Sequence, residues 1–268
     1  MSELVVTSAS NPRLKAVAAL RRRRVREEQG LTVVDGHEEL ALALAAGVAP
    51  RTLLHCPELM LDPETGATLV ERARAAGART IRCGRAAFEK VAYREGPDGV
   101  LAVVPVAGVA LADLDLPADP LVVVCEGLEK PGNLGAVLRT ADAAGAAAVL
   151  AADPATDWGN PNVVRASKGT VFTVPVATAP TEEVLRWLRS RGVRLVATTP
   201  DTSTLHTDVD YRGAVAVAVG TEKTGLTSAV LDAADARVRI PMHGRVNSLN
   251  ASTAAAVVVY EAVRQRSG

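Results

Sequence analysis

This sequence has few of the features that mark secreted, metal-bound or membrane proteins. Only three of its 268 residues are cysteines, Cys56, Cys83 and Cys125, and their wide spacing without a CxxC pair argues against a disulfide framework or a structural zinc site. No apolar run approaches the roughly 18 residues that a membrane-spanning helix needs. The N-terminus lacks the apolar stretch of a secretory signal, so we expect a cytoplasmic protein with no membrane partner.

Aromatic residues and net charge are also scarce. Phe, Trp and Tyr make up 3% of the chain, too few for the aromatic platforms that stack on single-stranded bases. The four histidines are scattered, unlike those of a metal enzyme, and no GxSxG nucleophile motif is present. Acidic and basic residues balance at 30 each, yet residues 1–30 carry seven basic and three acidic side chains, a net of +4. This excess suits contacts with nucleic-acid phosphates, although a solvated helix face has the same composition.

The apolar pattern predicts a small N-terminal α/β domain over residues 1–106. A helix at 11–29, with Asn11 as its cap and Pro12 in its first position, opens the domain. An alternation that favours a mostly parallel sheet follows. Its predicted strands are 31–36, 51–56, 78–83 and 99–106, and its predicted helices are 36–48, 63–77 and 85–92. Residues 107–120, rich in Ala, Asp and Pro, are predicted to form a linker.

A second alternation predicts another α/β domain over residues 121–268. Strands are expected at 121–127, 146–153, 171–177, 193–200, 213–220 and 236–242, helices at 134–145, 181–192 and 248–266, and a helix or turn at 162–170. The middle of the last helix, AAAVVVY, is apolar all round. We therefore expect that helix to be buried on more than one side, in the core or against a second subunit.

Three loops that follow apolar strands carry glycines and polar side chains. They are EGLEKPGNLGAVLRT (126–140), GTEKTGL (220–226) and PMHGRVNSLNAS (241–252). Each loop taken alone is readable as a turn or a helix cap, and Arg139 has a structural explanation as an i+3 partner of Asp142. Ligands bind in α/β sheets at the carboxyl ends of the strands, so the three loops together predict one shared site. The GxGxxG spacing is absent, which leaves a nicotinamide-dependent oxidoreductase as a distant alternative.

In order along the chain, these loops resemble the three motifs of the SpoU (TrmH-like) branch of the SPOUT RNA methyltransferases. The similarity extends over roughly residues 120–266, and Thr221 stands where serine is commoner. Residues 30–106 are similar, in a more general way, to the ribosomal-protein-like α/β substrate-binding domain that precedes the catalytic domain in many members. The matching segments are Asn133-x-Gly135-Ala-x-x-Arg139-Thr140 for motif one, Gly220-Thr-Glu222-x-x-Gly225-Leu226 for motif two, and Ile240-Pro241-Met242, Ser248-Leu249-Asn250 and Tyr260-Glu261 for motif three.

The resemblance implies a fold, a cofactor and a reaction. The fold is an α/β domain with a deep trefoil knot, packed as a homodimer, in which motif one of one subunit faces the cofactor of the other. The cofactor is S-adenosylmethionine, with no metal, and the reaction is methyl transfer to a ribose 2′-hydroxyl of RNA. Ribosomal RNA is favoured as the substrate over tRNA, and a catalytically idle RNA-binding module is a further alternative.

The resemblance also implies roles for individual residues. Because an arginine side chain almost never loses its proton, Arg139 is either a transient base or a group that holds a phosphate and polarises the hydroxyl, and we favour the second role. The implied catalytic residues are Arg139, Asn133, Glu222, Ser248 and Asn250. The implied cofactor-binding residues are Thr198, Thr199, Gly220, Thr221, Glu222, Gly225, Ile240, Met242, Ser248 and Leu249. The candidate RNA contacts are Arg21, Arg22, Arg23, Arg24, Arg26, Tyr93 and Arg94.

Overall fold

The computed structural model describes residues 3–267, which divide into two compact units. The first unit contains the chain up to Ala107 together with Asp157–Thr173, and the second contains Gly108–Thr156 and the chain from Val174 onward. The predicted division into residues 1–106, a linker and residues 121–268 did not include the return of segment 157–173 to the first unit. None of the helices within residues 3–267 combines the length and apolarity needed to cross a membrane.

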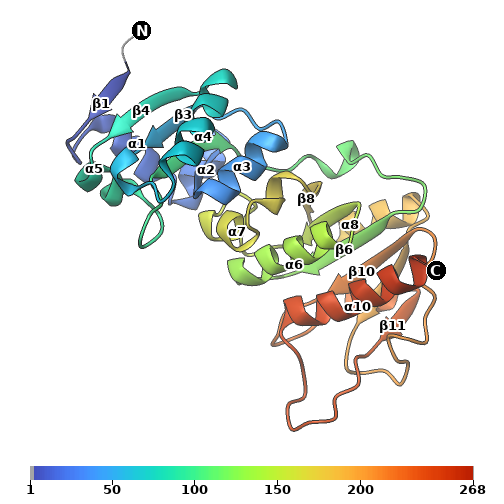
Figure 1. Ribbon diagram of the computed structural model, residues 1–268. Coiled ribbons are helices and arrows are strands. Elements are labelled where there is room, and N and C mark those ends of the chain that lie inside the picture. The colour runs from blue at the N-terminus through green and yellow to red at the C-terminus, as the bar shows by residue number, and fades with distance from the viewer. Residues whose placement is uncertain (1–2, 268) are drawn as a thin grey trace. The chain divides into compact units, whose positions relative to one another are not determined.

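The first unit is built on a five-stranded sheet in the order β1-β4-β3-β5-β2 (Figure 1). Strands β1 and β3 pair with β4 in parallel, whereas β5 runs antiparallel to both β3 and β2. Strands β1, β2, β3 and β4 therefore run in one direction, as predicted for a mostly parallel sheet, and among the five strands β5 alone is reversed. Helix α5 has only seven residues, about 10 Å of helix, so the chain does not travel back along the sheet before β5 begins. The elements are β1 (Leu4–Val6), α1 (Pro12–Ala19), α2 (Arg23–Gln29), β2 (Leu31–Asp35), α3 (His37–Ala45), β3 (Thr52–His55), η1 (Pro57–Leu59), α4 (Pro63–Ala75), β4 (Arg79–Cys83), α5 (Arg85–Val91), β5 (Val100–Pro105), α7 (Pro161–Ala166) and η3 (Thr170–Phe172).

The predicted helix 11–29 is two helices, α1 and α2, with a break after Leu20. Its start is as predicted, because the Asn11 side chain accepts a hydrogen bond from the Arg13 amide at 2.9 Å and Pro12 is the first helical residue. At the break, the guanidinium of Arg26 donates to the carbonyl oxygens of Leu20 and Arg21, both at 3.0 Å. These two bonds satisfy carbonyl groups that would otherwise lack partners at the end of α1.

Arg26 also ties the returning segment 157–173 to the first unit. Its side chain is only 3% exposed, and it donates to both carboxylate oxygens of Asp157, at 3.1 and 2.6 Å. The Thr32 hydroxyl donates to the Gly159 carbonyl at 2.5 Å, and Val163 in α7 is fully buried. Arg26 is therefore a structural residue, and its burial does not fit the prediction that it contacts RNA.

We expect Arg26→Ala to lower the free energy of unfolding by about 3 kcal/mol, because the Asp157 carboxylate and two carbonyl groups lose their donor. The matched control is Arg24→Ala, since Arg24 is 89% exposed and pairs only with Glu28 on the surface of α2. That change should cost less than about 0.5 kcal/mol. Urea denaturation followed by circular dichroism measures both values, and equal losses would contradict a structural role for Arg26.

The second unit is a six-stranded sheet with every neighbouring pair parallel, in the order β11-β9-β10-β6-β7-β8. Helices α6 and α10 pack together over one face of the sheet, and α8 and α9 cover the other (Figure 1). The six parallel strands bring their carboxyl ends, and the loops that follow them, to one edge. The elements are η2 (Leu111–Asp113), β6 (Leu121–Glu126), α6 (Pro131–Ala143), β7 (Ala148–Ala152), β8 (Val176–Ala179), α8 (Thr181–Ser190), β9 (Arg194–Thr198), β10 (Val215–Val219), α9 (Ser228–Ala233), β11 (Ala236–Val238) and α10 (Ala251–Arg266).

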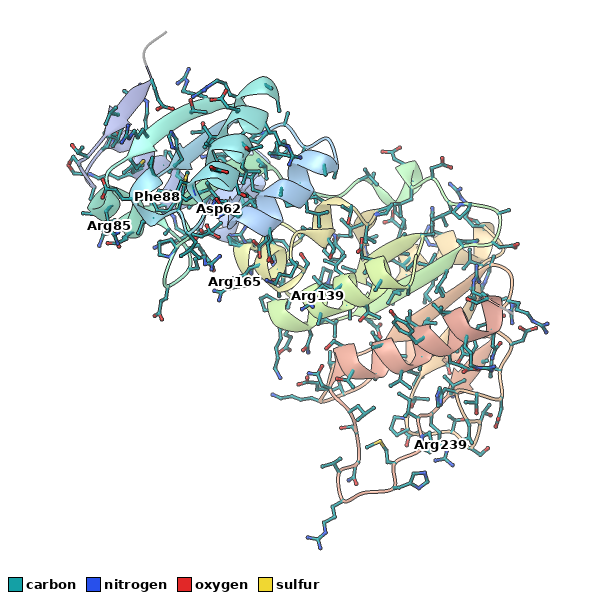
Figure 2. All side chains as sticks on the ribbon, in the orientation of Figure 1. Asp62, Arg85, Phe88, Arg139, Arg165 and Arg239 are labelled. Atoms are coloured by element: carbon teal, nitrogen blue, oxygen red, sulfur yellow. The ribbon has the colours of Figure 1, made fainter. Side chains whose placement is uncertain are left out.

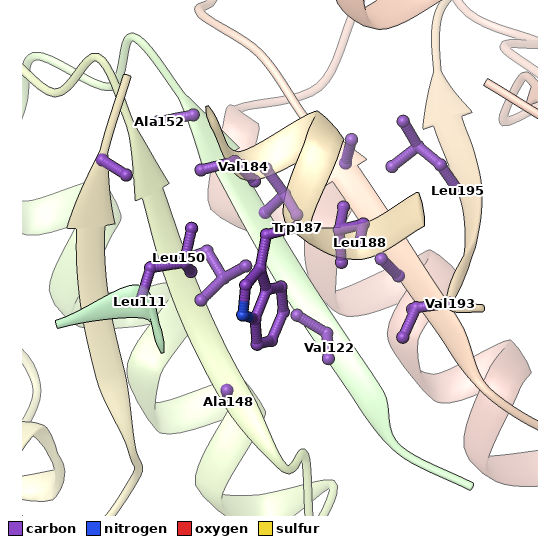
Figure 3. Close-up of a cluster of buried hydrophobic side chains, with 14 of the residues drawn as sticks. Leu111, Val122, Ala148, Leu150, Ala152, Val184, Trp187, Leu188, Val193 and Leu195 are labelled. Atoms are coloured by element: carbon purple, nitrogen blue, oxygen red, sulfur yellow. The ribbon is translucent and has the colours of Figure 1, made fainter. Parts of the chain in front are cut away.

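The core under α8 is formed by alternate residues of the central strands. Val122 and Val124 of β6 face α8 because successive side chains of a strand point to opposite faces of the sheet. Figure 3 shows Trp187 of α8 inserted among Leu111, Val122 and Leu150. Every residue of β6, β7 and β10 is buried, as expected of strands covered on both faces. This packing fixes the strand ends from which the site loops emerge.

Candidate functional site

A cavity of about 390 Å³ lies at the carboxyl ends of β9, β10 and β11. Its walls are the residues that follow these three strands and the loop that precedes α10. The volume falls within the range of small-molecule sites, and the position is where parallel sheets bind ligands. All ten residues predicted to hold the cofactor line it: Thr198, Thr199, Gly220, Thr221, Glu222, Gly225, Ile240, Met242, Ser248 and Leu249.

The loop 220–226 forms one wall of the cavity and is folded tightly on itself. The backbones of Thr221 and Gly225 exchange two hydrogen bonds of 3.1 and 3.0 Å. A Cβ atom on Gly220 would lie 2.2 Å from the carbonyl carbon of Gly225, so only glycine fits there. The Thr221 hydroxyl accepts the Thr224 amide at 3.1 Å, so threonine keeps the hydroxyl function where serine is commoner in the resemblance. These bonds make the loop a rigid backbone surface.

A buried carboxylate holds the far end of this loop. Glu126, the last residue of β6, is 3% exposed and accepts the Thr227 amide at 2.8 Å and the Thr227 hydroxyl at 2.7 Å. The Thr181 hydroxyl at the start of α8 donates to the same carboxylate at 3.3 Å. The Thr227 hydroxyl also caps α9, as the sequence allows. Glu126 therefore anchors the loop 220–226 to the central strand of the sheet.

Glu222 joins the three sequence motifs in a single polar cluster. Its Oε1 accepts hydrogen bonds from the side-chain amides of Asn133 at 3.2 Å and Asn250 at 2.5 Å, and its Oε2 accepts from Lys130 Nζ at 2.5 Å. The Asn250 amide also donates to Asn133 Oδ1 at 3.1 Å. The Lys130 ammonium, followed by the Asn133 amide, holds the pKa of Glu222 below its usual range. Glu222 is thus an ionised acceptor near neutral pH rather than a base.

Asn250 and Asn133 both lie near the start of a helix, but only Asn250 caps its helix. Asn250 is the N-cap of α10, since its Oδ1 accepts the Ser252 amide at 3.0 Å, and its side-chain amide remains free to bind the cluster. One residue therefore serves as both cap and cluster member. Asn133 is not the N-cap of α6, because the helix begins at Pro131 and Lys130 is the cap. Asn133 projects instead from the first turn toward Glu222.

Arg139 lies outside both the cluster and the cavity. It is six residues beyond Asn133 on α6, about 9 Å along the helix axis, and does not line the cavity. Figure 2 shows it well separated from Arg239, which does line the cavity after β11. Its guanidinium is exposed and forms no hydrogen bond or ion pair seen among residues 3–267. Its positive charge is free to bind a ligand or another chain.

The predicted RNA contacts lie in the first unit. The Arg21 guanidinium donates to the carbonyls of Val91 and Ala92 and lies 5.9 Å from the centre of the Tyr93 ring. The Tyr93 hydroxyl accepts from the Asn162 amide at 3.0 Å. Six of the seven predicted residues keep at least part of their surface exposed, and Arg26 does not: the six are Arg21, Arg22, Arg23, Arg24, Tyr93 and Arg94.

Comparisons with known proteins agree with the motif resemblance. The SpoU rRNA Methylase family matches residues 120–260, and the MRM3-like substrate binding domain matches residues 11–102. The 23S rRNA (guanosine-2'-O-)-methyltransferase RlmB of Ralstonia nicotianae is 36% identical over 204 residues, which are 74% of this chain and 82% of the relative. The 23S rRNA (uridine(2479)-2'-O)-methyltransferase of Streptomyces viridochromogenes is 33% identical over 93% of this chain and 88% of the relative. The solved structure of an AdoMet-bound rRNA methyltransferase from Sinorhizobium meliloti has a TM-score of 0.88 at 31% identity and covers 97% of both chains.

Proposed function

Because the chain belongs to the SpoU rRNA methylase family, we propose that it transfers the methyl group of S-adenosylmethionine to a ribose 2′-hydroxyl of ribosomal RNA. The observation that carries the proposal is that the loops of motifs two and three line one cavity, while Asn133 of motif one joins Glu222 and Asn250 in a cluster beside it. The two 23S rRNA relatives act on different nucleosides, guanosine and uridine. The family membership opposes the nicotinamide-dependent alternative.

The residues of the cavity fit S-adenosylmethionine. Apolar side chains of Leu226, Ile240, Met242 and Leu249 offer a surface for a flat base, and the backbone around Gly220 allows close approach. When bound, the cofactor supplies an electrophilic sulfonium methyl group, so the protein has mainly to bind and orient the two substrates. We place the cofactor against the loops after β9, β10 and β11, and assign its binding to the ten predicted residues that line them.

The acceptor hydroxyl needs help that Glu222 does not give. A ribose hydroxyl is a poor nucleophile until its proton is lost or shared, and Glu222 already accepts hydrogen bonds from Lys130, Asn133 and Asn250. We assign Glu222 the task of fixing the two asparagine amides, which orient the ribose together with Ser248. Arg139 binds the neighbouring phosphate and polarises the hydroxyl, because its guanidinium stays protonated.

We propose a homodimer in which Arg139 of one subunit completes the site of the other. Within residues 3–267 of one chain, Arg139 does not line the cavity and makes no hydrogen bond or ion pair. The outward face of α10 carries Ala256 and Val257, both half-buried, and Tyr260, which is 48% exposed, beside α6. Apolar side chains at this position suit burial against a second copy of the helix pair. This arrangement would bury the apolar closing helix on a further side, which is one of the two ways in which its sequence pattern can be satisfied.

The first unit is proposed to bind the RNA. Its basic N-terminal segment supplies Arg21 to Arg24, and Tyr93 and Arg94 lie in the loop after α5. Arg23 and Arg24 make surface ion pairs with Glu27 and Glu28, which are weak enough to be exchanged for phosphate contacts. Recognition by such groups depends on phosphates and shape and weakens with salt.

The trefoil knot and the cellular location are part of the proposal. The chain leaves the edge strand β11, runs through the loop 239–250 and returns as α10 over the central strands β10 and β6. A return from the edge to the centre of the sheet supports threading of the C-terminal segment through an earlier loop. We propose a cytoplasmic location, which a ribosomal RNA substrate supports.

Transfer of labelled methyl groups to separated ribosomal RNA and tRNA tests the function. We expect label in ribosomal RNA, retained after alkaline hydrolysis in resistant dinucleotides, because alkaline cleavage needs a free 2′-hydroxyl. Label in tRNA would change the substrate class, and label in mononucleotides would mean base methylation. Absence of label from naked RNA and from ribosomal particles at every stage of assembly would contradict the proposed function.

A further inference from the structure

Lys130 is a cation of the site that lies outside the three motifs. It ends the loop after β6, caps α6, and donates to Glu222 Oε2 at 2.5 Å. The Lys130 side chain is 67% exposed, and the Glu222 side chain is 29% exposed. An ammonium group has three donors, of which this carboxylate takes one. The exposed donors therefore face solvent beside the cavity.

The stability of the fold does not account for this ion pair. An exposed lysine–carboxylate pair contributes little to stability because water screens it and the side chain loses conformational freedom. The electrostatics of substrate binding give a better reason. Glu222 carries a negative charge at the rim of the cavity, where a polyanionic RNA has to approach, and Lys130 neutralises that charge.

Lys130 and Arg139 occupy separate places on α6. Nine residues separate them, which is about 13 Å along the axis and about half a turn around it. Lys130 is paired with Glu222, which lines the cavity of the same chain. Arg139 has no such link and does not line that cavity. The two cations cannot contact the same phosphate from one chain.

We propose that Lys130 is a substrate-binding residue whose ammonium contacts the RNA phosphate next to the acceptor ribose while it remains paired with Glu222. The assignment rests on the proposed function. Each site would then hold two cations, Lys130 from its own chain and Arg139 from the other subunit. Pairing to Glu222 holds the ammonium at the rim, and the remaining N–H groups bind the phosphate as a charge-assisted contact.

The test compares Lys130→Gln with Arg186→Gln, which removes one positive charge from an exposed position on α8. For Lys130→Gln we expect the KM for a large-subunit ribosomal RNA transcript to rise about tenfold. The Kd for S-adenosylmethionine should stay within about twofold, because Lys130 itself does not line the cavity. The slope of log K for RNA binding against log salt should fall by about 0.7 to 0.9, the value of one phosphate contact. Arg186→Gln should match the wild type, and Lys130→Arg should keep the slope.

A second background separates phosphate binding from simple neutralisation. In Glu222→Gln no carboxylate remains to be neutralised, so Lys130→Gln added to it should still lower the salt slope if the phosphate contact exists. An unchanged slope in both backgrounds would overturn the proposal. So would a loss of cofactor affinity equal to the loss of RNA affinity, which would make Lys130 only a support for the loop 220–226. Wild-type protein that methylates no RNA contradicts the proposed function instead, and the binding slopes still decide the role of Lys130.

Discussion

Replacing Arg139 by alanine is expected to reduce methyl transfer by about 10³-fold, the loss typical of removing one group that stabilises charge in a transition state. The same variant should bind S-adenosylmethionine with a Kd within about twofold of the wild type, because Arg139 does not line the cavity. Its fold should also persist, since the side chain is exposed and makes no hydrogen bond or ion pair with residues 3–267. Single-turnover transfer and cofactor titration measure the two quantities. Retained turnover would remove Arg139 from the mechanism.

For the proposed homodimer, a mixing experiment tells which subunit the Arg139 guanidinium serves. One partner carries Arg139→Ala and has an intact cavity, and the other carries Gly220→Ala, whose added methyl group would lie 2.2 Å from the Gly225 carbonyl carbon. If Arg139 acts across the dimer, the mixed dimer contains one complete site, made of the first chain's cavity and the second chain's Arg139. Activity should then appear in purified mixed dimers of two inactive chains. Inactive mixed dimers would place Arg139 in the site of its own chain.

The second unit was largely predictable because its strands are continuous apolar runs. The runs LVVVC (121–125) and VAVAV (215–219) are apolar at every position, as is typical of strands that are covered by helices on both faces of a sheet. They form β6 and β10, whose residues are all buried. The predicted strand at 171–177 is wrong at its start, because residues 170–172 form a 3₁₀ turn that belongs to the first unit. The helix α9 was not among the predicted helices, since six residues give too short a periodic pattern to identify.

The first unit was harder to predict because its decisive contacts join distant residues. The return of segment 157–173 depends on the buried pair between Arg26 and Asp157, which are 131 residues apart. An arginine in a run of four others looks like part of a solvated or RNA-binding face, and only its carbonyl and carboxylate partners identify it as structural. Strand β1 has three residues, below the length at which alternation is visible.

The site itself was predicted more completely than the fold around it. Motif residues from three loops meet at one edge of the sheet because parallel strands end there, and Asn133, Glu222 and Asn250 are in direct contact. Lys130 was missed because a single lysine before a proline resembles any helix entry. The available signal was its position just before Pro131, the first residue of α6, at a helix entry that faces the motif-two loop with its Glu222. Glu126 was missed because a lone acidic residue at the end of an apolar strand has no local pattern.

Gly220→Ala is expected to weaken S-adenosylmethionine binding by about 100-fold, because a backbone displacement near 1 Å is enough for a loss of that size. The added Cβ would overlap the backbone of Gly225 and Leu226, which cannot rotate away as a side chain can. The loop is held at its base by Glu126 through Thr227 and at its tip by Glu222, so it has little freedom to absorb the shift. The variant should therefore lose affinity or release one of these anchors.

Gly244→Ala is the matched control, since Gly244 lies in the loop before α10, does not line the cavity, and has open space where a Cβ would be. It should bind the cofactor with the wild-type Kd by calorimetry. If Gly220→Ala also binds normally, the backbone of loop 220–226 is not the cofactor surface, and the assignment of the cavity to S-adenosylmethionine fails. If Gly220→Ala loses affinity and Gly244→Ala does not, the loss belongs to the contact between Gly220 and Gly225. A lower melting temperature in Gly220→Ala alone, with normal affinity at 10 °C, would instead mean that the glycine is needed only for folding.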